Sequence, residues 1–120
     1  MGYVAAFPIP ELVRQINAFM LGALSVNPDV TMSVRWTNEW LDPPAVTQAV
    51  NALLSEGADV INNHQTSTAA VETASDNEAW AFTYTTSMSE AAGEYYGSSA
   101  VFKWEEFYRP TLQAVNNGNW

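Results

Sequence analysis

Short apolar runs alternate with longer stretches of helical periodicity along the whole chain, and this alternation strongly limits the folds available to it. The apolar runs cover residues 3–7, 30–36, 58–61, 80–84 and 98–102. The stretches between most of them carry apolar residues three and four positions apart, as amphipathic helices do. Alternating strands and helices imply right-handed crossovers and a parallel sheet. We therefore expect an α/β fold, a doubly wound parallel sheet of about five strands with helices on both faces.

Proline and capping signals mark where the predicted helices begin. Pro10 and Glu11 open the first helix, because proline suits the first turn and a carboxylate favours the positive end of the helix dipole. Asp42 followed by Pro43 is an N-cap and first-turn pair for the second helix, which Gly57 ends. The helix starts are therefore encoded locally.

The later part of the chain is less regular. A third helix follows a polar loop over residues 62–67, whereas residues 85–97 have no sustained period and form a long loop or a broken helical turn. A final helix carries Phe107, Leu112 and Val115, and Pro110 either lies in its first turn or kinks it. We expect residues 1–120 to form a single α/β lobe.

Charge and residue usage exclude several classes of function. Thirteen acidic and four basic residues give a net charge of −9, which repels the phosphates of nucleic acids. The chain has no cysteine and a single histidine, so it has no thiolate nucleophile and no multi-histidine metal site. A glycine-rich phosphate loop, a nucleophile elbow and a calcium loop are also missing. We expect no enzyme activity, no metal, no cofactor and no nucleic acid partner.

The chain shows no membrane span or export signal. No run approaches the roughly 18 consecutive apolar residues of a membrane-spanning helix. A basic segment followed by an apolar core and a small-residue cleavage site is also absent from the start of the chain. We expect the chain as given to be soluble.

The loops after the predicted strands are the place to look for a ligand, because doubly wound sheets bind ligands beyond the carboxyl ends of their strands. These loops contain Phe7, Trp40, His64, Gln65 and several hydroxyl residues. Aromatic faces combined with hydrogen-bonding groups suit a flat polar ligand.

Each of these residues also has a structural interpretation. Trp40 could serve only to pack its loop, and Phe7 could be a core residue at a strand end. His64 has no carboxylate or nucleophile nearby in the sequence, which favours a hydrogen-bonded loop histidine over a catalytic base. Lys103 fits an outward-pointing residue slightly better than a ligand contact, and the adjacent Glu105 and Glu106 fit a solvated face.

An ordered series of segments resembles the ligand-gripping C-terminal lobe of basic membrane lipoproteins, substrate-binding proteins of ABC importers with the type I periplasmic binding protein fold. The similar segments are residues 2–11 (GYVAAFPIPE), 16–19, Gly22, 26–29, 36–38, Trp40, Asp42 with Pro43, 57–61 (GADVI), His64 with Gln65, Ser67 with Thr68, and 80–82. They follow one another over nearly the whole chain, so the series is more specific than any single motif.

The resemblance implies a two-lobed receptor that closes on its ligand and passes a purine nucleoside or nucleobase to the permease of an ABC transporter. It also implies a periplasmic protein or a membrane-anchored lipoprotein, with an N-terminal lobe that this chain lacks and a second lobe that is incomplete here. An aromatic residue before the Asp-Pro pair stacks on the base in this family, and Trp40 holds that position.

Two positions depart from the family pattern. Where family members that bind ribose have acidic residues after the fourth strand, this chain has residues 83–87, in which both acidic positions are hydroxyl residues. The ribose-contacting lysine falls on Phe102, with Lys103 one residue away and on the opposite face. These departures favour a free nucleobase or another small heteroaromatic molecule. The predicted ligand-binding residues are Phe7, Pro8, Trp40, His64, Gln65, Thr85, Ser87 and Phe102.

Two other interpretations of the same fold stay open. The chain could be the ligand-sensing lobe of a regulator or receptor, which a DNA-binding or membrane-signalling segment would indicate. It could also be a small flavodoxin-like enzyme, which would require a reactive group at the strand ends.

Overall fold

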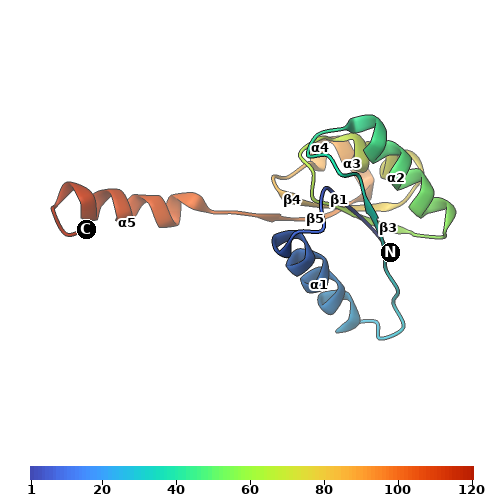
Figure 1. Ribbon diagram of the computed structural model, residues 1–120, viewed down its shortest axis with the longest axis horizontal. Coiled ribbons are helices and arrows are strands. Elements are labelled where there is room, and N and C mark those ends of the chain that lie inside the picture. The colour runs from blue at the N-terminus through green and yellow to red at the C-terminus, as the bar shows by residue number, and fades with distance from the viewer.

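The computed structural model describes all 120 residues and contains one sheet of five parallel strands in the order β2-β1-β3-β4-β5 (Figure 1). The strands are β1 (Gly2–Ala5), β2 (Ser33–Trp36), β3 (Val60–Asn63), β4 (Trp80–Thr85) and β5 (Tyr96–Val101). The helices are α1 (Pro10–Leu24), α2 (Pro43–Ser55), α3 (Ala69–Asp76), α4 (Ser89–Ala92) and α5 (Trp104–Asn116), with a 3₁₀ turn at Gly93–Tyr95. The predicted fold class is confirmed.

The predicted helix starts are also confirmed. Pro10 is the first residue of α1, where its missing N–H costs no hydrogen bond. The Asp42 side chain accepts a hydrogen bond from the Ala45 backbone N–H at 3.0 Å and caps α2. Gly57 follows α2 with a φ of 90°, a backbone conformation that glycine adopts without a steric penalty.

The two faces of the sheet are covered by different helices. Val4 on β1 is buried in a core with residues of α2 and α3, whereas its neighbours Tyr3 and Ala5 are buried on the other face against Leu12 and Ile16 of α1. This division follows from the alternation of side chains along a strand. The sheet is therefore a layer between α1 on one side and α2, α3 and α4 on the other.

The strands β2 and β3 differ from their predicted limits for reasons of pairing. β2 begins at Ser33 instead of residue 30, because Ser33 pairs with Gly2 at the start of β1 and no strand lies beside the residues before it. β3 continues through Asn62 and Asn63, which were predicted to begin a loop. Asn63 is buried and hydrogen-bonds with both the N–H and the carbonyl of Gln65, so its polar side chain is satisfied inside the fold.

The segment without a sustained period is a broken helical region, one of the two predicted alternatives. It contains the single turn of α4 and the 3₁₀ turn, and β5 then begins at Tyr96, two residues earlier than predicted. The interruption falls at Gly93, whose φ is 53°.

The last helix, α5, does not cover either face of the sheet. It has no buried residue and extends away from the sheet beyond the end of β5 (Figure 1). The radius of gyration is 16.6 Å, compared with about 13.6 Å for a compact chain of this length. Pro110 lies inside α5, so the alternative that placed it in the first turn is wrong.

None of the helices combines the length and the apolar character needed to cross a membrane.

Candidate ligand-binding site

One aromatic ring lies at or just after the end of each of the five strands, and each ring contacts the next in a row of five. The ring centroids of Phe7 and Trp40 lie 5.1 Å apart, and those of Trp40 and His64 lie 6.0 Å apart. His64 stacks on Tyr84 at 5.3 Å, and Tyr84 contacts Phe102 at 5.4 Å. We call these five residues the aromatic row. Because all the strands are parallel, their carboxyl ends lie at one edge of the sheet, and the row runs along that edge.

The aromatic row has faces open to a ligand. Trp40 is 52% exposed and Phe102 is 45% exposed, whereas Phe7, His64 and Tyr84 between them are partly buried. A contiguous group of exposed apolar side chains, unlike a single exposed one, often marks a surface that contacts a partner or a ligand. The row therefore offers two exposed rings on a base of partly buried ones, a surface on which a flat molecule can stack.

Gln65 lies below the loop that carries Trp40. Its Nε2 donates hydrogen bonds to Thr37 Oγ1 at 2.5 Å and to the Glu39 carbonyl at 2.8 Å. The side chain is buried, and its Oε1 has no hydrogen-bond partner. Gln65 thus holds the loop that carries Trp40 in place through these two hydrogen bonds.

The surroundings of His64 favour its neutral form. Burial lowers its pKa below the usual value, and the negative charge of Glu11 opposes this effect only in part. Its Nδ1 has no hydrogen-bond partner. A neutral imidazole stacked on Tyr84 fits a member of a binding surface, and no hydrogen bond joins it to a nucleophile.

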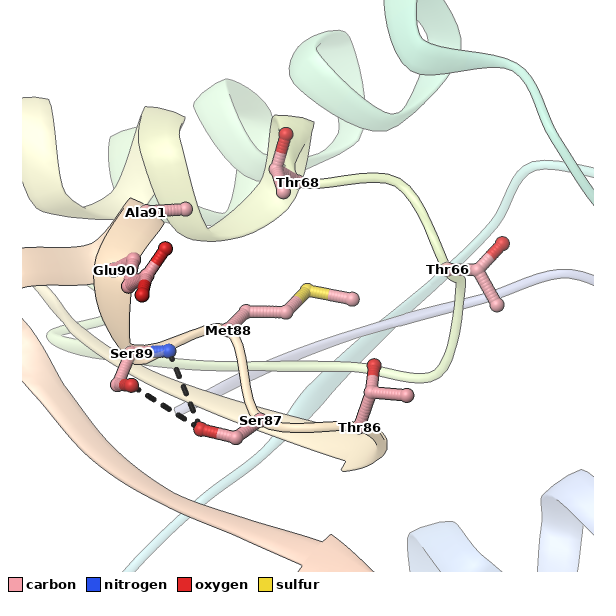
Figure 2. A pocket seen from close by; sticks show the side chains of 8 residues that line it. All are labelled: Thr66, Thr68, Thr86, Ser87, Met88, Ser89, Glu90 and Ala91. Carbon is pink, nitrogen blue, oxygen red and sulfur yellow. Dashed lines mark hydrogen bonds between the residues drawn. The ribbon is translucent and has the colours of Figure 1, made fainter.

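A hollow lined mainly by hydroxyl residues lies between the segments that follow β3 and β4. Its volume is about 530 Å³, and it is lined by Thr66, Thr68, Thr86, Ser87, Met88, Ser89, Glu90 and Ala91. Figure 2 shows the residues that line it, with Thr66 and Thr68 on the segment after β3 and residues 86–91 on the segment after β4. We call this hollow the hydroxyl groove. It follows His64 and Tyr84 directly in the chain, so it adjoins the aromatic row.

Ser87 and Glu90 give the hydroxyl groove its polar character. Ser87 Oγ lies 3.2 Å from both Ser89 Oγ and the Tyr96 hydroxyl. Glu90 is exposed and forms no salt bridge, so its carboxylate is available to accept hydrogen bonds from a ligand. Hydroxyl groups and a carboxylate together suit a ligand with several O–H or N–H donors.

Thr85 shapes this region through its backbone. Its φ is 71°, which is unfavourable for a β-branched residue and costs on the order of 1–3 kcal/mol. The following Thr86 carbonyl accepts hydrogen bonds from Thr83 Oγ1 at 3.0 Å and Ser99 Oγ at 2.8 Å. Thr85 is not among the residues that line the hydroxyl groove.

The structure brings together most of the residues singled out in the sequence. Phe7, Trp40, His64 and Phe102 belong to the aromatic row, and Ser87 lines the hydroxyl groove. Pro8 is exposed directly after Phe7.

Sequence reasoning missed two residues of this region. Tyr84 was assigned only to a strand, although it stands next to the end of that strand. Glu90 lies in a segment with no period, so no sequence signal indicated where its side chain would lie. In the folded chain, Tyr84 joins His64 to Phe102 and Glu90 faces the hydroxyl groove.

The structure contains no group of three or more histidine, cysteine, aspartate or glutamate side chains that could hold a metal ion. The features of the edge are aromatic faces and hydrogen-bonding groups, which are the features of a small-molecule binding site.

These observations define the class of the protein: it has the fold of one lobe of a type I periplasmic binding protein. The chain superimposes on an ABC transporter solute-binding protein from Conexibacter woesei with a TM-score of 0.80 at 18% identity, covering 99% of this chain and 40% of that one. It superimposes on a transcriptional activator of the comK gene from Bacillus halodurans with a TM-score of 0.84 at 23% identity, covering 41% of that chain. At these identities the likeness concerns the fold alone.

The family follows from the sequence. The model of the Bmp family, described as "ABC transporter substrate-binding protein PnrA-like", matches residues 1–120, and the chain belongs to this family.

Two curated relatives support the assignment. A putative ABC transporter glucose-binding protein of Haloferax volcanii is 53% identical over 120 residues, and a purine-binding protein of Brucella abortus is 40% identical over 119 residues. The chain spans 31% and 34% of the length of these relatives.

Proposed function

We propose that this chain is the ligand-gripping lobe of the substrate-binding component of an ABC importer, and that its ligand is a purine nucleoside or a free nucleobase. The ligand stacks on the aromatic row, with Trp40 as its main contact, and it is held between this lobe and a second one. The closed complex then delivers it to the transporter permease. The observation that carries the proposal is the row of aromatic rings at the carboxyl edge of the sheet.

The chemistry of the site supports a purine. Stacking on an aromatic side chain contributes about 1–3 kcal/mol per base and is available to any flat heterocycle. A neutral imidazole such as that of His64 has one donor and one acceptor nitrogen, and the hydroxyl groove offers further hydrogen-bond partners for the edge of a base. The Brucella relative carries the name of a purine-binding protein.

The hydroxyl groove bears on whether the ligand includes a sugar. Phe102 and the hydroxyl residues within residues 83–87 stand where the family's ribose contacts are expected, and this favours a base. Glu90, however, places a carboxylate in the neighbouring hydroxyl groove, at a different position in the sequence from the family's acidic residues. A sugar hydroxyl could donate to it, and a hydrogen bond to a charged group contributes about 1.5–3 kcal/mol.

The location follows from the same proposal. A substrate-binding protein of an importer acts outside the cytoplasmic membrane, so we propose a periplasmic or lipid-anchored position for the full-length protein.

Calorimetric titration tests the ligand. Residues 1–120 replace the matching segment of the Haloferax relative, which gives a protein of the full relative's length, and this graft is titrated with adenine, hypoxanthine, guanosine, adenosine and glucose. Binding of a purine supports the proposal, and comparison of bases with nucleosides decides whether the sugar is recognised. Heat with glucose alone, or no heat from a folded graft, contradicts the purine assignment.

Glu90→Gln separates the two kinds of purine ligand. We expect this change to weaken nucleoside binding by roughly 10- to 150-fold and to leave base binding unchanged, because only the sugar reaches the carboxylate. If the variant and the unaltered graft bind every nucleoside with equal affinity, Glu90 does not contact the ligand.

A further inference from the structure

Two buried amide side chains, Asn63 and Gln65, lie on either side of His64 in the chain. Asn63 is 0% exposed and Gln65 is 2% exposed. Burying an amide group costs free energy unless the group is hydrogen-bonded, so the partners of these side chains indicate what they do in the fold. Their partners all belong to the two segments that carry the neighbouring rings of His64 and Trp40.

Asn63 fixes the backbone around His64. Its Oδ1 accepts a hydrogen bond from the Gln65 backbone N–H at 3.0 Å, and its Nδ2 donates one to the Gln65 carbonyl at 2.8 Å. The His64 backbone N–H donates to the Val4 carbonyl at 3.2 Å. Both backbone groups of Gln65 are therefore tied to the end of β3, which gives its side chain a fixed base.

The Gln65 side chain reaches from this base to the loop that carries Trp40. Its Nε2 donates to Thr37 Oγ1 and to the Glu39 carbonyl, and Thr37 Oγ1 donates to the same carbonyl at 2.9 Å. A carbonyl only accepts hydrogen bonds, so the atom of Gln65 that faces it is the amide nitrogen. The peptide group directly before Trp40 is thus held by two donors.

Gln65 does not share the exposed surface of the aromatic row. Its Oε1 is closed off from solvent and has no hydrogen-bond partner, whereas the Trp40 ring is 52% exposed. An unpaired buried acceptor costs stability. In this structure any benefit of Gln65 to ligand binding passes through the groups that its Nε2 holds.

We propose that Gln65 is a positioning residue, which holds the Trp40 ring in place beside His64 before a ligand arrives and raises the affinity for the ligand without touching it. Ordering the ring in advance strengthens binding because Kd increases as the fraction of molecules with a competent site falls. The proposal rests on the function proposed above, since it concerns the same stacking surface.

Fluorine NMR of the graft labelled with fluorotryptophan tests the positioning without a ligand. Trp40→Phe and Trp80→Phe assign the two resonances. The rings of Phe7 and His64 beside Trp40 should shift its resonance from that of the free amino acid. We expect Gln65→Met, which removes Nε2 and keeps a side chain of similar length, to move the Trp40 resonance toward the free value and to leave that of Trp80 unchanged.

An unchanged Trp40 resonance in the Gln65→Met variant, or an equal movement of the Trp80 resonance, would overturn the proposal. Because no ligand is present in this experiment, its result stands even if the purine titration fails.

A double-mutant cycle tests the effect on affinity, by calorimetry with whichever of adenine, hypoxanthine, guanosine and adenosine binds most tightly. We expect Gln65→Met to raise Kd roughly fivefold or more, but by no more than Trp40→Ala does. When Trp40 is already alanine, Gln65→Met should change Kd by less than about twofold, because the ring that it positions is missing. An equal rise in both backgrounds would show that Gln65 acts on the ligand independently of Trp40, and would refute the positioning role.

A pair of variants at Thr37 tests the same contact by a milder change. Thr37→Val removes the Oγ1 atom that accepts from Gln65 and nearly keeps the shape of the side chain, whereas Thr37→Ser keeps the hydroxyl group. We expect Thr37→Val to raise Kd and to move the Trp40 resonance in the same direction as Gln65→Met. Thr37→Ser should behave like the unaltered graft. Equal behaviour of the two variants would contradict the proposal.

Val50→Ala is the control for a general loss of stability. Val50 is fully buried in the core that α2 and α3 form with the sheet, and it has no contact with the polar groups described above. We expect Val50→Ala to lower the thermal unfolding temperature and to leave Kd within about twofold. If it raised Kd as much as Gln65→Met does, the effect of Gln65 would be one of stability alone and the proposal would be wrong.

Discussion

Replacing Trp40 with alanine should weaken ligand binding without unfolding the lobe. The ring is 52% exposed and contacts two other rings, those of Phe7 and His64. Stacking of a base on such a ring is worth about 1–3 kcal/mol. We therefore expect Kd for a purine to rise by roughly 5- to 150-fold in the graft. The two ring contacts contribute about 0.5–1.5 kcal/mol each to stability, so the free energy of unfolding should fall by no more than about 3 kcal/mol.

Trp80 provides a matched control at the opposite edge of the sheet. It is the first residue of β4, is 49% exposed, and contacts Tyr95 with ring centroids 6.0 Å apart. Trp80→Ala removes a ring of equal size and similar exposure, and we expect it to leave Kd unchanged. Calorimetry and thermal unfolding of both variants are compared with the unaltered graft. An affinity for Trp40→Ala within twofold of the unaltered protein, or an equal loss in both variants, would refute stacking on Trp40.

Three further predictions concern stability. A Cβ on Gly2 would lie 2.8 Å from Leu53 Cδ1, so Gly2→Ala should destabilise the chain by about 1–3 kcal/mol in chemical denaturation. Gly22→Ala should stabilise the chain by up to about 1 kcal/mol, because a Cβ there meets nothing within 4 Å and alanine favours the helix. If both substitutions changed the free energy of unfolding in the same direction, the packing described for these two glycines would be wrong. Burial, and secondly the charge of Tyr84, raise the pKa of Tyr3 to about 12 from 10.0. The folded state thus favours the neutral phenol, so about 2.7 kcal/mol of stability is present below pH 10 and is lost as the pH rises to 12. A Tyr3→Phe variant that loses as much stability over this range would show that another group is responsible.

The elements that depend on near neighbours in the chain could be predicted from the sequence. Asp42 caps α2 through a backbone N–H three residues away, and Pro10 acts within its own helical turn. The alternation of apolar runs with helical periods led to the sheet, because short buried strands joined by helices have few ways to pack. Of the site residues, those at predicted strand ends were found for the same reason, since parallel strands end at one edge.

Pairing between distant segments decided the rest. Asn62 and Asn63 look like the start of a loop, yet β1 and β4 on either side extend the strand through Asn62 and the Gln65 backbone satisfies Asn63. Tyr84 became the link between His64 and Phe102 only when three strands were placed side by side. Glu90 reached the hydroxyl groove through a short helical turn that has no sequence period.

Helix α5 shows both what the sequence determines and what only the tertiary structure determines. Its apolar spacing by itself determined that residues near Phe107, Leu112 and Val115 form a helix with one face to bury, because that pattern depends only on the 3.6-residue repeat. The spacing of apolar residues does not indicate which surface that face packs against. Only the tertiary structure decided that this lobe does not, because β5 places the helix beyond the edge of its own sheet, where none of the helix residues is buried.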